Sequence, residues 1–84
     1  MIISEVTAYA LDEEFKKIYL GDSSGKIKSF YLSSGEFLIE YESHKDEISI
    51  IFSVKKYDFL ITCSKDLCIK FHKLNEGNKV LKES

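Results

Sequence analysis

The chain repeats its own pattern once, with a period of 42 residues. Identical residues that keep this spacing include Ile27 and Ile69, Lys28 and Lys70, Leu32 and Leu74, and Gly35 and Gly77. Between them, apolar, turn and charged positions stay in phase, and two such units account for all 84 residues. A period of this size indicates a repeat architecture, in which each unit packs against its neighbour.

Each unit reads as a series of short strands. Runs of four to seven residues are rich in β-branched and aromatic side chains, and several alternate apolar with polar positions. No stretch sustains the i, i+3, i+4, i+7 spacing of an amphipathic helix. The expected strands span residues 5–10, 15–20, 26–32 and 36–41 in the first unit, and 48–54, 57–62, 68–74 and 78–81 in the second.

Residues typical of turns separate these runs. Asp22-Ser23-Ser24-Gly25 predicts a tight hairpin turn in which Gly25 adopts a positive φ. Ser33-Ser34-Gly35 and Asn75-Glu76-Gly77 occupy equivalent positions and predict a matched pair of hairpin loops. The sequence therefore predicts that the strands of each unit are joined consecutively, as an antiparallel meander.

The predicted fold class is all-β, with four-stranded antiparallel meanders at residues 1–42 and 43–84. Units of about 40–45 residues made of short strands are typical of β-propeller blades. A propeller closes with about four to eight blades, so two blades are incomplete as a ring. Because each blade buries its apolar faces against its neighbours, we expect this chain to be part of something larger.

Residues 43–74, SHKDEISIIFSVKKYDFLITCSKDLCIKFHKL, resemble a blade of the WD-repeat family. Ser43-His44 stands at the family's Gly-His position, and Phe52-Ser53-Val54 stands at its Phe-Ser-Pro. The run 69–73 matches the strand that normally ends in Trp-Asp. The resemblance extends over the whole chain and is closer in the second unit, so it implies two blades of a WD-repeat propeller.

In that family a His, a Ser or Thr, an Asp and a Trp form a hydrogen-bonded network. The resemblance assigns these four positions to His44, Thr62, Asp66 and His72, with His72 in place of the Trp. An imidazole can donate to a carboxylate and accept from a hydroxyl, which would tie strands and a loop together. The corresponding positions of the first unit hold Ile2, Leu20, Ser24 and Phe30. This degenerate repeat is expected to be held by packing alone.

The resemblance implies a non-enzymatic scaffold that mediates protein–protein contacts in a large assembly. Within the family, the chain looks most like blades of the long WD-repeat proteins of ciliary axonemes, which implies an axonemal or cytoskeletal complex. Its partners would be other proteins or neighbouring blades, contacted through loops at one end of the strands. The candidate interaction residues are Asp22, Ser24, Lys45, Asp46, Glu47 and Lys65.

The charge pattern argues against a nucleic-acid partner. The formal net charge is −2, and all 12 basic residues are Lys. The chain therefore lacks Arg, the residue best suited to bidentate recognition of phosphate or guanine. Lys28 and Lys70, both expected to face solvent, are interleaved along the chain with acids such as those at 12–14. Mixed-sign charge of this kind is the usual state of a solvated protein surface.

We expect no catalytic site, metal or cofactor. The His44–Asp66 pair would need a nucleophile or metal beside it to act in catalysis. Cys63, Cys68 and His72 have the spacing C-x4-C-x3-H, but a structural zinc site needs a fourth ligand. The two cysteines are instead expected to be small buried hydrophobes. The EF-hand pattern is absent from the sequence.

The longest apolar run is far shorter than the ~18 residues that cross a bilayer, and the N-terminal residues do not resemble a secretory signal. We therefore expect an intracellular, cytoplasmic location, with the cilium as one setting. Two alternatives to the scaffold stay open. One is a short subunit that self-assembles into a closed propeller. The other is a nucleic-acid- or small-ligand-binding propeller, for whose channel the inner strands offer only Thr7 and Ser49.

Overall fold

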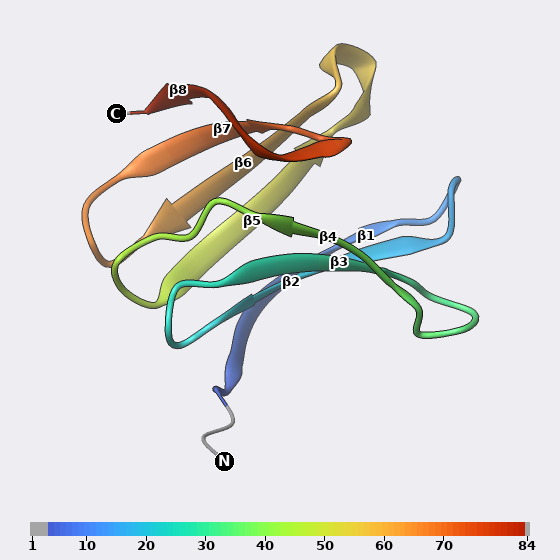
Figure 1. Cartoon of the computed structure of the whole chain (residues 1–84), viewed down its shortest axis with the longest axis horizontal. Coiled ribbons are helices and arrows are strands. Elements are labelled where there is room, and N and C mark those ends of the chain that lie inside the picture. Colours follow the sequence, from blue (N-terminus) through green and yellow to red (C-terminus); the bar gives the residue numbers. More distant parts are fainter. Residues whose placement is uncertain (1–3, 84) are drawn as a thin grey trace.

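The computed structural model describes residues 4–83, with side chains placed for residues 4–76 (Figure 1). Position Ile2 lies outside the described residues. The strands are β1 (Val6–Asp12), β2 (Lys17–Asp22), β3 (Ile27–Tyr31), β4 (Phe37–Tyr41), β5 (Ile48–Val54), β6 (Phe59–Ser64), β7 (Ile69–Lys73) and β8 (Glu76–Glu83). A single 3-10 turn, η1 (Lys55–Tyr57), joins β5 to β6 within the described part of the chain.

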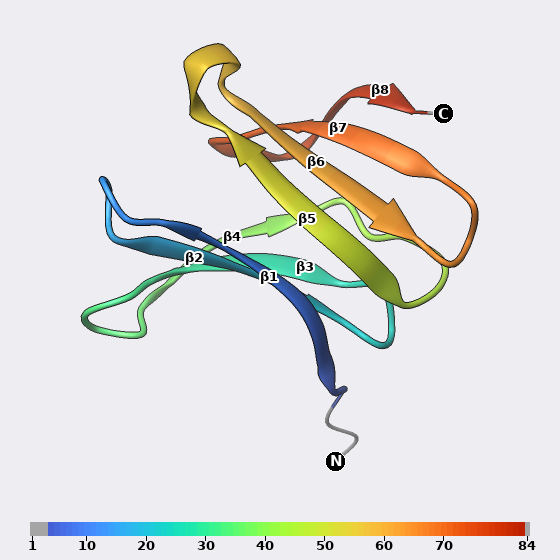
Figure 2. The ribbon, with the colours of Figure 1, turned by 180° about the vertical axis from the view of Figure 1, so that it is seen from behind.

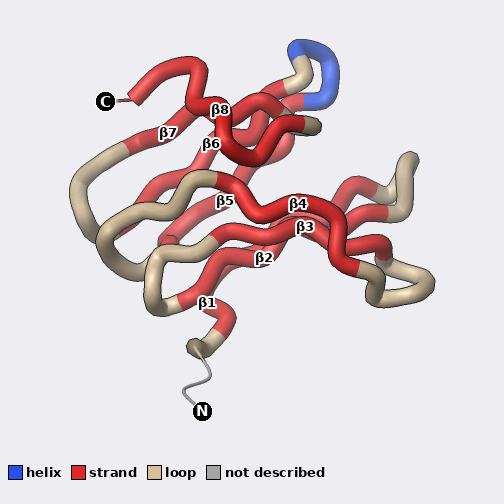
Figure 3. Tube along the Cα trace, viewed as in Figure 1, coloured by secondary structure: helices blue, strands red, loops and turns tan. Residues whose placement is uncertain are grey.

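The strands form two four-stranded antiparallel sheets, which we call the N-terminal sheet (β1–β4) and the C-terminal sheet (β5–β8). In each sheet every strand pairs with the strand that precedes or follows it in sequence (Figure 3). The two sheets stack with one face of each turned toward the other, as the opposite views of Figures 1 and 2 show. This confirms the predicted all-β class of two open meanders of the propeller-blade type.

Two strands begin later than the sequence predicted. The expected strands at 15–20 and 57–62 start instead at Lys17 in β2 and at Phe59 in β6. The reason is local, because Lys16 (φ 56°) and Asp58 (φ 61°) adopt left-handed backbone conformations just before these strands. The two residues are 42 positions apart, so the same turn geometry recurs in both units.

The prediction of matching hairpin loops in the two units is wrong for the second unit. In the first unit Gly35 has a φ of 72° in the loop between β3 and β4, as expected of a turn glycine. In the second unit Lys73 pairs directly with Glu76, so β8 begins at Glu76 and Gly77 lies inside the strand. The β7–β8 loop is therefore shortened to the two residues Leu74 and Asn75.

The core lies between the two sheets. Residues paired directly across strands share a face, so the pairing defines which side chains meet there. The inner face of the N-terminal sheet contains Ala8, Ala10, Tyr19, Ile27, Ser29 and Tyr41. The inner face of the C-terminal sheet contains Ile48, Ile51, Leu60, Thr62, Lys70 and His72.

The two inner faces approach each other closely beside Gly21 in β2. A Cβ atom at Gly21 would lie 2.7 Å from the Cβ atom of Ile48, so any larger residue would push the sheets apart. Near this contact the hydroxyl of Thr7 donates to the backbone carbonyl of Ile48 over 2.7 Å. Thr7 therefore links β1 to β5, whereas a residue that lined a channel would have its hydroxyl free.

Candidate functional site

Three connections gather at one end of the sheets, on the left in Figure 1. They are the β2–β3 turn, the β4–β5 loop and the β6–β7 turn, and we call them together the loop surface. Backbone hydrogen bonds join them: the His44 N–H donates to the Gly25 carbonyl over 2.9 Å, and the Lys65 N–H donates to the Glu47 carbonyl over 3.0 Å. Loops joined in this way form one continuous surface rather than three independent tips.

Beneath this surface the structure brings together His44, Thr62, Asp66 and His72. Nδ1 of His44 lies 3.1 Å from Oδ2 of Asp66, and Nε2 of the same ring lies 2.7 Å from the Thr62 hydroxyl oxygen. On its other side the Thr62 oxygen lies 2.8 Å from Nε2 of His72. His72 thus makes the contact expected of the residue that replaces Trp.

The direction of each bond follows from the carboxylate at one end. Ionised Asp66 can only accept, so Nδ1 of His44 carries the proton and donates it. In a neutral His44 ring Nε2 then accepts from the Thr62 hydroxyl, and Thr62 in turn accepts from Nε2–H of His72. The network is therefore a directional chain from β7 through β6 to the β4–β5 loop.

Asp66 also anchors the surface through the backbone. Its carboxylate accepts the Lys45 N–H at 2.9 Å and the Cys68 N–H at 2.9 Å, in addition to the His44 ring. Burial alone would raise the Asp66 pKa, but these backbone hydrogen bonds, together with His44, lower that pKa to about 2. Asp66 therefore holds its own β6–β7 turn and the β4–β5 loop opposite while remaining charged.

His72 is fully buried between the sheets, and the Tyr41 ring packs edge-on against it, with the two ring centroids 5.7 Å apart. The Tyr41 hydroxyl crosses the interface and donates to the Leu74 carbonyl. Burial, with smaller effects from His44 and Lys70, lowers the His72 pKa to about 4. Nδ1 of His72 has no hydrogen-bond partner among the described residues, which fits a neutral ring.

Acid is expected to destabilise the fold in two stages. Between the ordinary His pKa of 6.5 and about 4, the unfolded chain binds a proton that folded His72 does not. The free energy of unfolding therefore decreases as the pH is lowered through this range, by up to about 1.4 kcal/mol per pH unit for one proton. Asp66 stabilises the fold above its ordinary pKa of 3.8 and loses that contribution as pH falls toward 2. Urea unfolding between about pH 7 and about pH 2 would measure both stages.

A His72→Phe variant is the matched control for this pH dependence, because Phe30 holds the equivalent position in the first unit. The variant should lose the stage near neutral pH and keep the stage below about pH 4. An unchanged slope near neutral pH would show that His72 is not the group responsible.

The six candidate interaction residues all lie on the loop surface. Asp22 is half-buried and shapes its own turn, since its Oδ1 accepts the Ser24 N–H at 2.9 Å and the Ser24 hydroxyl at 2.7 Å. Burial would raise the Asp22 pKa, but the bonds from Ser24 lower it. Asp22 therefore orders the turn, while Ser24 at its tip is exposed.

The other four candidates belong to the two remaining connections. Lys45 and Asp46 are exposed at the tip of the β4–β5 loop. Lys65 pairs with Glu47 at 3.1 Å, which joins the side chains of two connections as the backbone bonds do. An exposed pair of this kind contributes little stability, so its charges are free to serve recognition.

The sequence placed Leu67 in a contact loop, residues 63–67, but did not include it among the candidate interaction residues. Leu67 is 92% exposed and adopts a φ of 69°, while its N–H donates to the Ser64 carbonyl at 3.2 Å. A bulky residue in this conformation is a genuine outlier, and such strain gathers at functional sites. The repeat carried the signal, because Leu67 occupies the position of Gly25, whose φ is 93°.

Two charged residues lie where the sequence did not predict them. Lys70 is only 7% exposed rather than facing solvent, because it stands on the inner face of the C-terminal sheet and donates to the Ser43 carbonyl at 2.9 Å. Asp12 is 2% exposed at the opposite end of the sheets, paired with Lys55 at 2.9 Å. Burial would raise the Asp12 pKa, but the bond from Lys55 lowers it.

The prediction that both cysteines are buried is also wrong. Cys63 and Cys68 are only partly buried. Cys63 pairs with Ile50 and Ile69 on the side of the C-terminal sheet that no other described element covers. Among the residues that the structure describes, no group of three or more His, Cys, Asp or Glu side chains could hold a metal ion. The described residues also form no helix of the length and apolarity needed to cross a membrane.

No family model matches the sequence, and no curated protein matches it either. Solved structures do match the fold. The computationally designed Ika8 protein matches 95% of this chain with a TM-score of 0.83 at 24% identity. The computationally designed Ika4 protein matches 96% with a TM-score of 0.79 at 22% identity. Sqt1 of Saccharomyces cerevisiae matches 94% with a TM-score of 0.80 at 11% identity.

These matches occupy 24%, 48% and 20% of the three longer chains, so this chain spans between a fifth and a half of the structures that it resembles. At such identities the likeness concerns the fold alone. The fold is that of two adjacent blades of the β-propeller type.

Proposed function

We propose that the chain is a non-enzymatic part of a WD-repeat-like propeller, and that its loop surface binds another protein. The observation that carries this proposal is the exposed Leu67, held in a strained backbone conformation on a surface whose loops are joined by hydrogen bonds. An apolar side chain presented on a rigid support loses little entropy on binding, which favours its use as an anchor.

The charges around Leu67 support a protein partner. The loop surface carries exposed side chains of both signs of charge, namely Lys45, Asp46 and Lys65. Mixed charge around an apolar anchor is typical of protein interfaces, which have a polar rim, whereas a nucleic-acid site would be predominantly basic. Our proposed setting is an axonemal or cytoskeletal assembly, supported by the resemblance of the sequence to axonemal WD-repeat blades.

Replacing Leu67 with Gly is expected to separate stability from binding. Gly adopts a positive φ without the cost of about 1–2 kcal/mol that an L-residue incurs, and this gain is partly offset by the greater freedom of Gly in the unfolded chain. The free energy of unfolding should therefore rise by up to about 1 kcal/mol, while partner binding weakens. Urea unfolding measures the first effect, and quantitative affinity capture from an extract of the protein's own cells measures the second.

The control for capture is Tyr57→Ser, which removes an exposed aromatic ring, 61% accessible, from the end of the sheets opposite the loop surface. Proteins that bind the loop surface should be retained by Tyr57→Ser, and lost from both Leu67→Gly and the charge reversal Lys65→Glu. If all variants retain the same proteins as the unaltered chain, the loop surface is not the binding site.

A further inference from the structure

The two exposed sheet faces are repeat counterparts of the two faces already packed together. Tyr19 and Ile27 lie on the buried inner face of the N-terminal sheet. Their counterparts 42 residues later, Ile61 and Ile69, lie on the opposite face of the C-terminal sheet, which faces away from the core. Each unit thus offers two different packing faces, and each has used only one of them inside the chain.

The outer face of the C-terminal sheet is largely apolar. It includes Ile50, Phe52, Ile61, Cys63, Ile69 and Phe71, placed on one side by direct pairing across β5, β6 and β7, with Phe59 and Lys73 paired at one end. Phe52 is 58% exposed and Ile50 is 46% exposed. A continuous apolar face of this kind marks an interaction surface.

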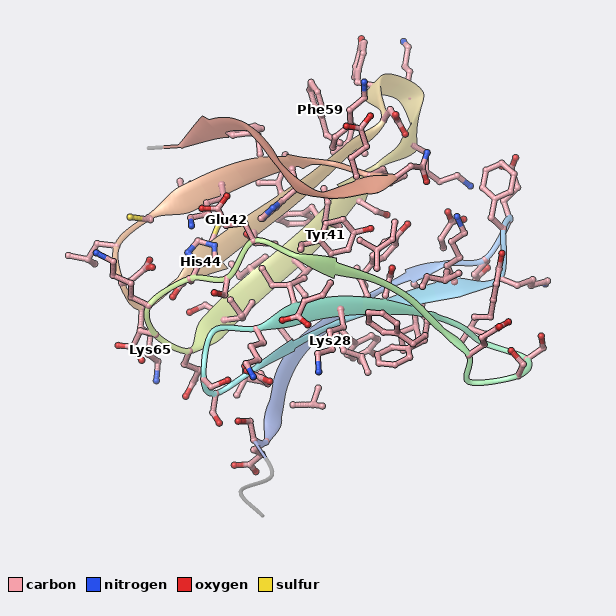
Figure 4. All side chains as sticks on the ribbon, in the orientation of Figure 1. Lys28, Tyr41, Glu42, His44, Phe59 and Lys65 are labelled. Carbon is pink, nitrogen blue, oxygen red and sulfur yellow. The ribbon has the colours of Figure 1, made fainter. Side chains whose placement is uncertain are left out.

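The outer face of the N-terminal sheet is also largely apolar. It includes Val6, Tyr9, Leu11, Ile18, Leu20 and Phe30, which share one side of β1, β2 and β3. Tyr9 is 64% exposed and Val6 is 54% exposed. Figure 4 shows the two outer faces on opposite sides of the molecule, with Phe59 above the C-terminal sheet and Lys28 below the N-terminal sheet.

The repeat also indicates which residues of the two outer faces would meet. Inside the chain, Gly21 leaves room for the side chain of Ile48. The counterpart of Gly21 is the larger Cys63, and the counterpart of Ile48 is the smaller Val6. If the same step between sheets were repeated, Cys63 would meet Val6. Val6 keeps the Cβ and both Cγ atoms that in Ile48 crowd Gly21, so the two sheets would stand further apart at this point than they do inside the chain.

We propose that the outer face of the N-terminal sheet of one copy packs on the outer face of the C-terminal sheet of a second copy. Between the two copies, this contact repeats the packing of the N-terminal sheet on the C-terminal sheet that is seen within one chain. Because it joins different faces, it is a head-to-tail contact that can close into a ring. Rings of about four to eight blades correspond to about two to four copies.

Blocking one face at a time tests the head-to-tail contact. Tyr9→Glu blocks the outer face of the N-terminal sheet, and Phe52→Glu blocks that of the C-terminal sheet. Light scattering after size exclusion should give the unaltered 84-residue chain a mass of two to four times 9.7 kDa, and each variant alone a mass of 9.7 kDa. Mixed in equal amounts, the two variants should form a dimer with one of each, because one intact face of each kind remains.

This dimer also shows that both variants are folded, since an unfolded chain would present neither face. A monomeric unaltered chain would overturn the proposal, and so would variants that keep the unaltered mass or a mixture that stays monomeric. Binding of the unaltered monomer to blades of a different protein would likewise overturn it in favour of that partner.

A covalent cross-link tests the register of the contact. Val6→Cys introduces a thiol that should face the native Cys63 of the next copy, and mild oxidation should then yield a covalent dimer or larger species on a non-reducing gel. Within one chain these two positions lie on opposite sides of the stacked sheets, so the link must join two copies. Adding Cys63→Ser should abolish the product and adding Cys68→Ser should not. Any other pattern rejects this register.

This inference is independent of the loop surface. If the chain is a monomer and Leu67→Gly abolishes the capture of proteins, the ring is rejected and the proposed function is supported. If the chain forms a ring and Leu67→Gly leaves capture unchanged, the ring is supported and the proposed function is rejected.

Discussion

Replacing Gly25 with Ala is expected to remove most of the stability of this fold. Gly25 has a φ of 93°, and a Cβ atom there would lie 2.3 Å from the His44 carbonyl oxygen and 2.7 Å from that of Asp46. Both are backbone atoms, so the clash is relieved only if the β4–β5 loop moves away and the loop surface opens. We expect a loss of about 3 kcal/mol or more in the free energy of unfolding, measured by urea denaturation.

Gly35→Ala is the matched control. Gly35 also has a positive φ, 72°, but a Cβ atom there would meet nothing within 4 Å. In this variant the free energy of unfolding should decrease only by the cost of the left-handed conformation, about 1–2 kcal/mol. The difference between the two variants isolates the close approach of the loops, and equal losses would show that the approach is not important for stability.

The second large effect is expected for Asp66→Ala. The carboxylate accepts hydrogen bonds from the His44 ring and from two backbone N–H groups, those of Lys45 and Cys68. Its removal leaves three donors without this acceptor at a partly buried place, and each unsatisfied buried group costs about 1–3 kcal/mol. We expect a total loss of about 3 kcal/mol in the free energy of unfolding at neutral pH.

Asp46→Ala provides the comparison within the same loop surface. Asp46 is exposed, and among the described residues its carboxylate accepts only the N–H of the adjacent Glu47, at 2.7 Å. Its removal should cost less than about 0.5 kcal/mol, as is usual for surface substitutions. If Asp46→Ala were as costly as Asp66→Ala, the loss would reflect the charge of the loop rather than the network.

Much of the fold could be predicted because the signals are local and occur twice. Alternation and turn residues identified all eight strands, and the resemblance of the second unit to a WD-repeat blade identified the positions of His44, Thr62, Asp66 and His72. Strand ends were less predictable, because the left-handed conformations of Lys16 and Asp58 leave no mark in residue type. Both are polar residues in ordinary turns, and only the structure shows where each turn ends.

The sequence could not predict which face of each sheet is buried. Ile18 and Tyr19 are both apolar, as are Leu60 and Ile61, so alternation alone cannot choose between them. The structure buries Tyr19 in one unit and Leu60 in the other. For the same reason Lys70 was expected at the surface, and its burial became evident only once its partner strand and the facing sheet were known.

The connectivity of the N-terminal sheet has a consequence for synthesis on the ribosome. All pairing partners of β1–β4 are present once Tyr41 has been made, but the face carrying Tyr19, Ile27 and Tyr41 waits for strands that are translated later. At about 5–20 residues per second, the next 42 residues take roughly two to eight seconds. During that interval a formed sheet exposes an apolar side, and slower translation of the second half would prolong its exposure to chaperones and to other nascent chains.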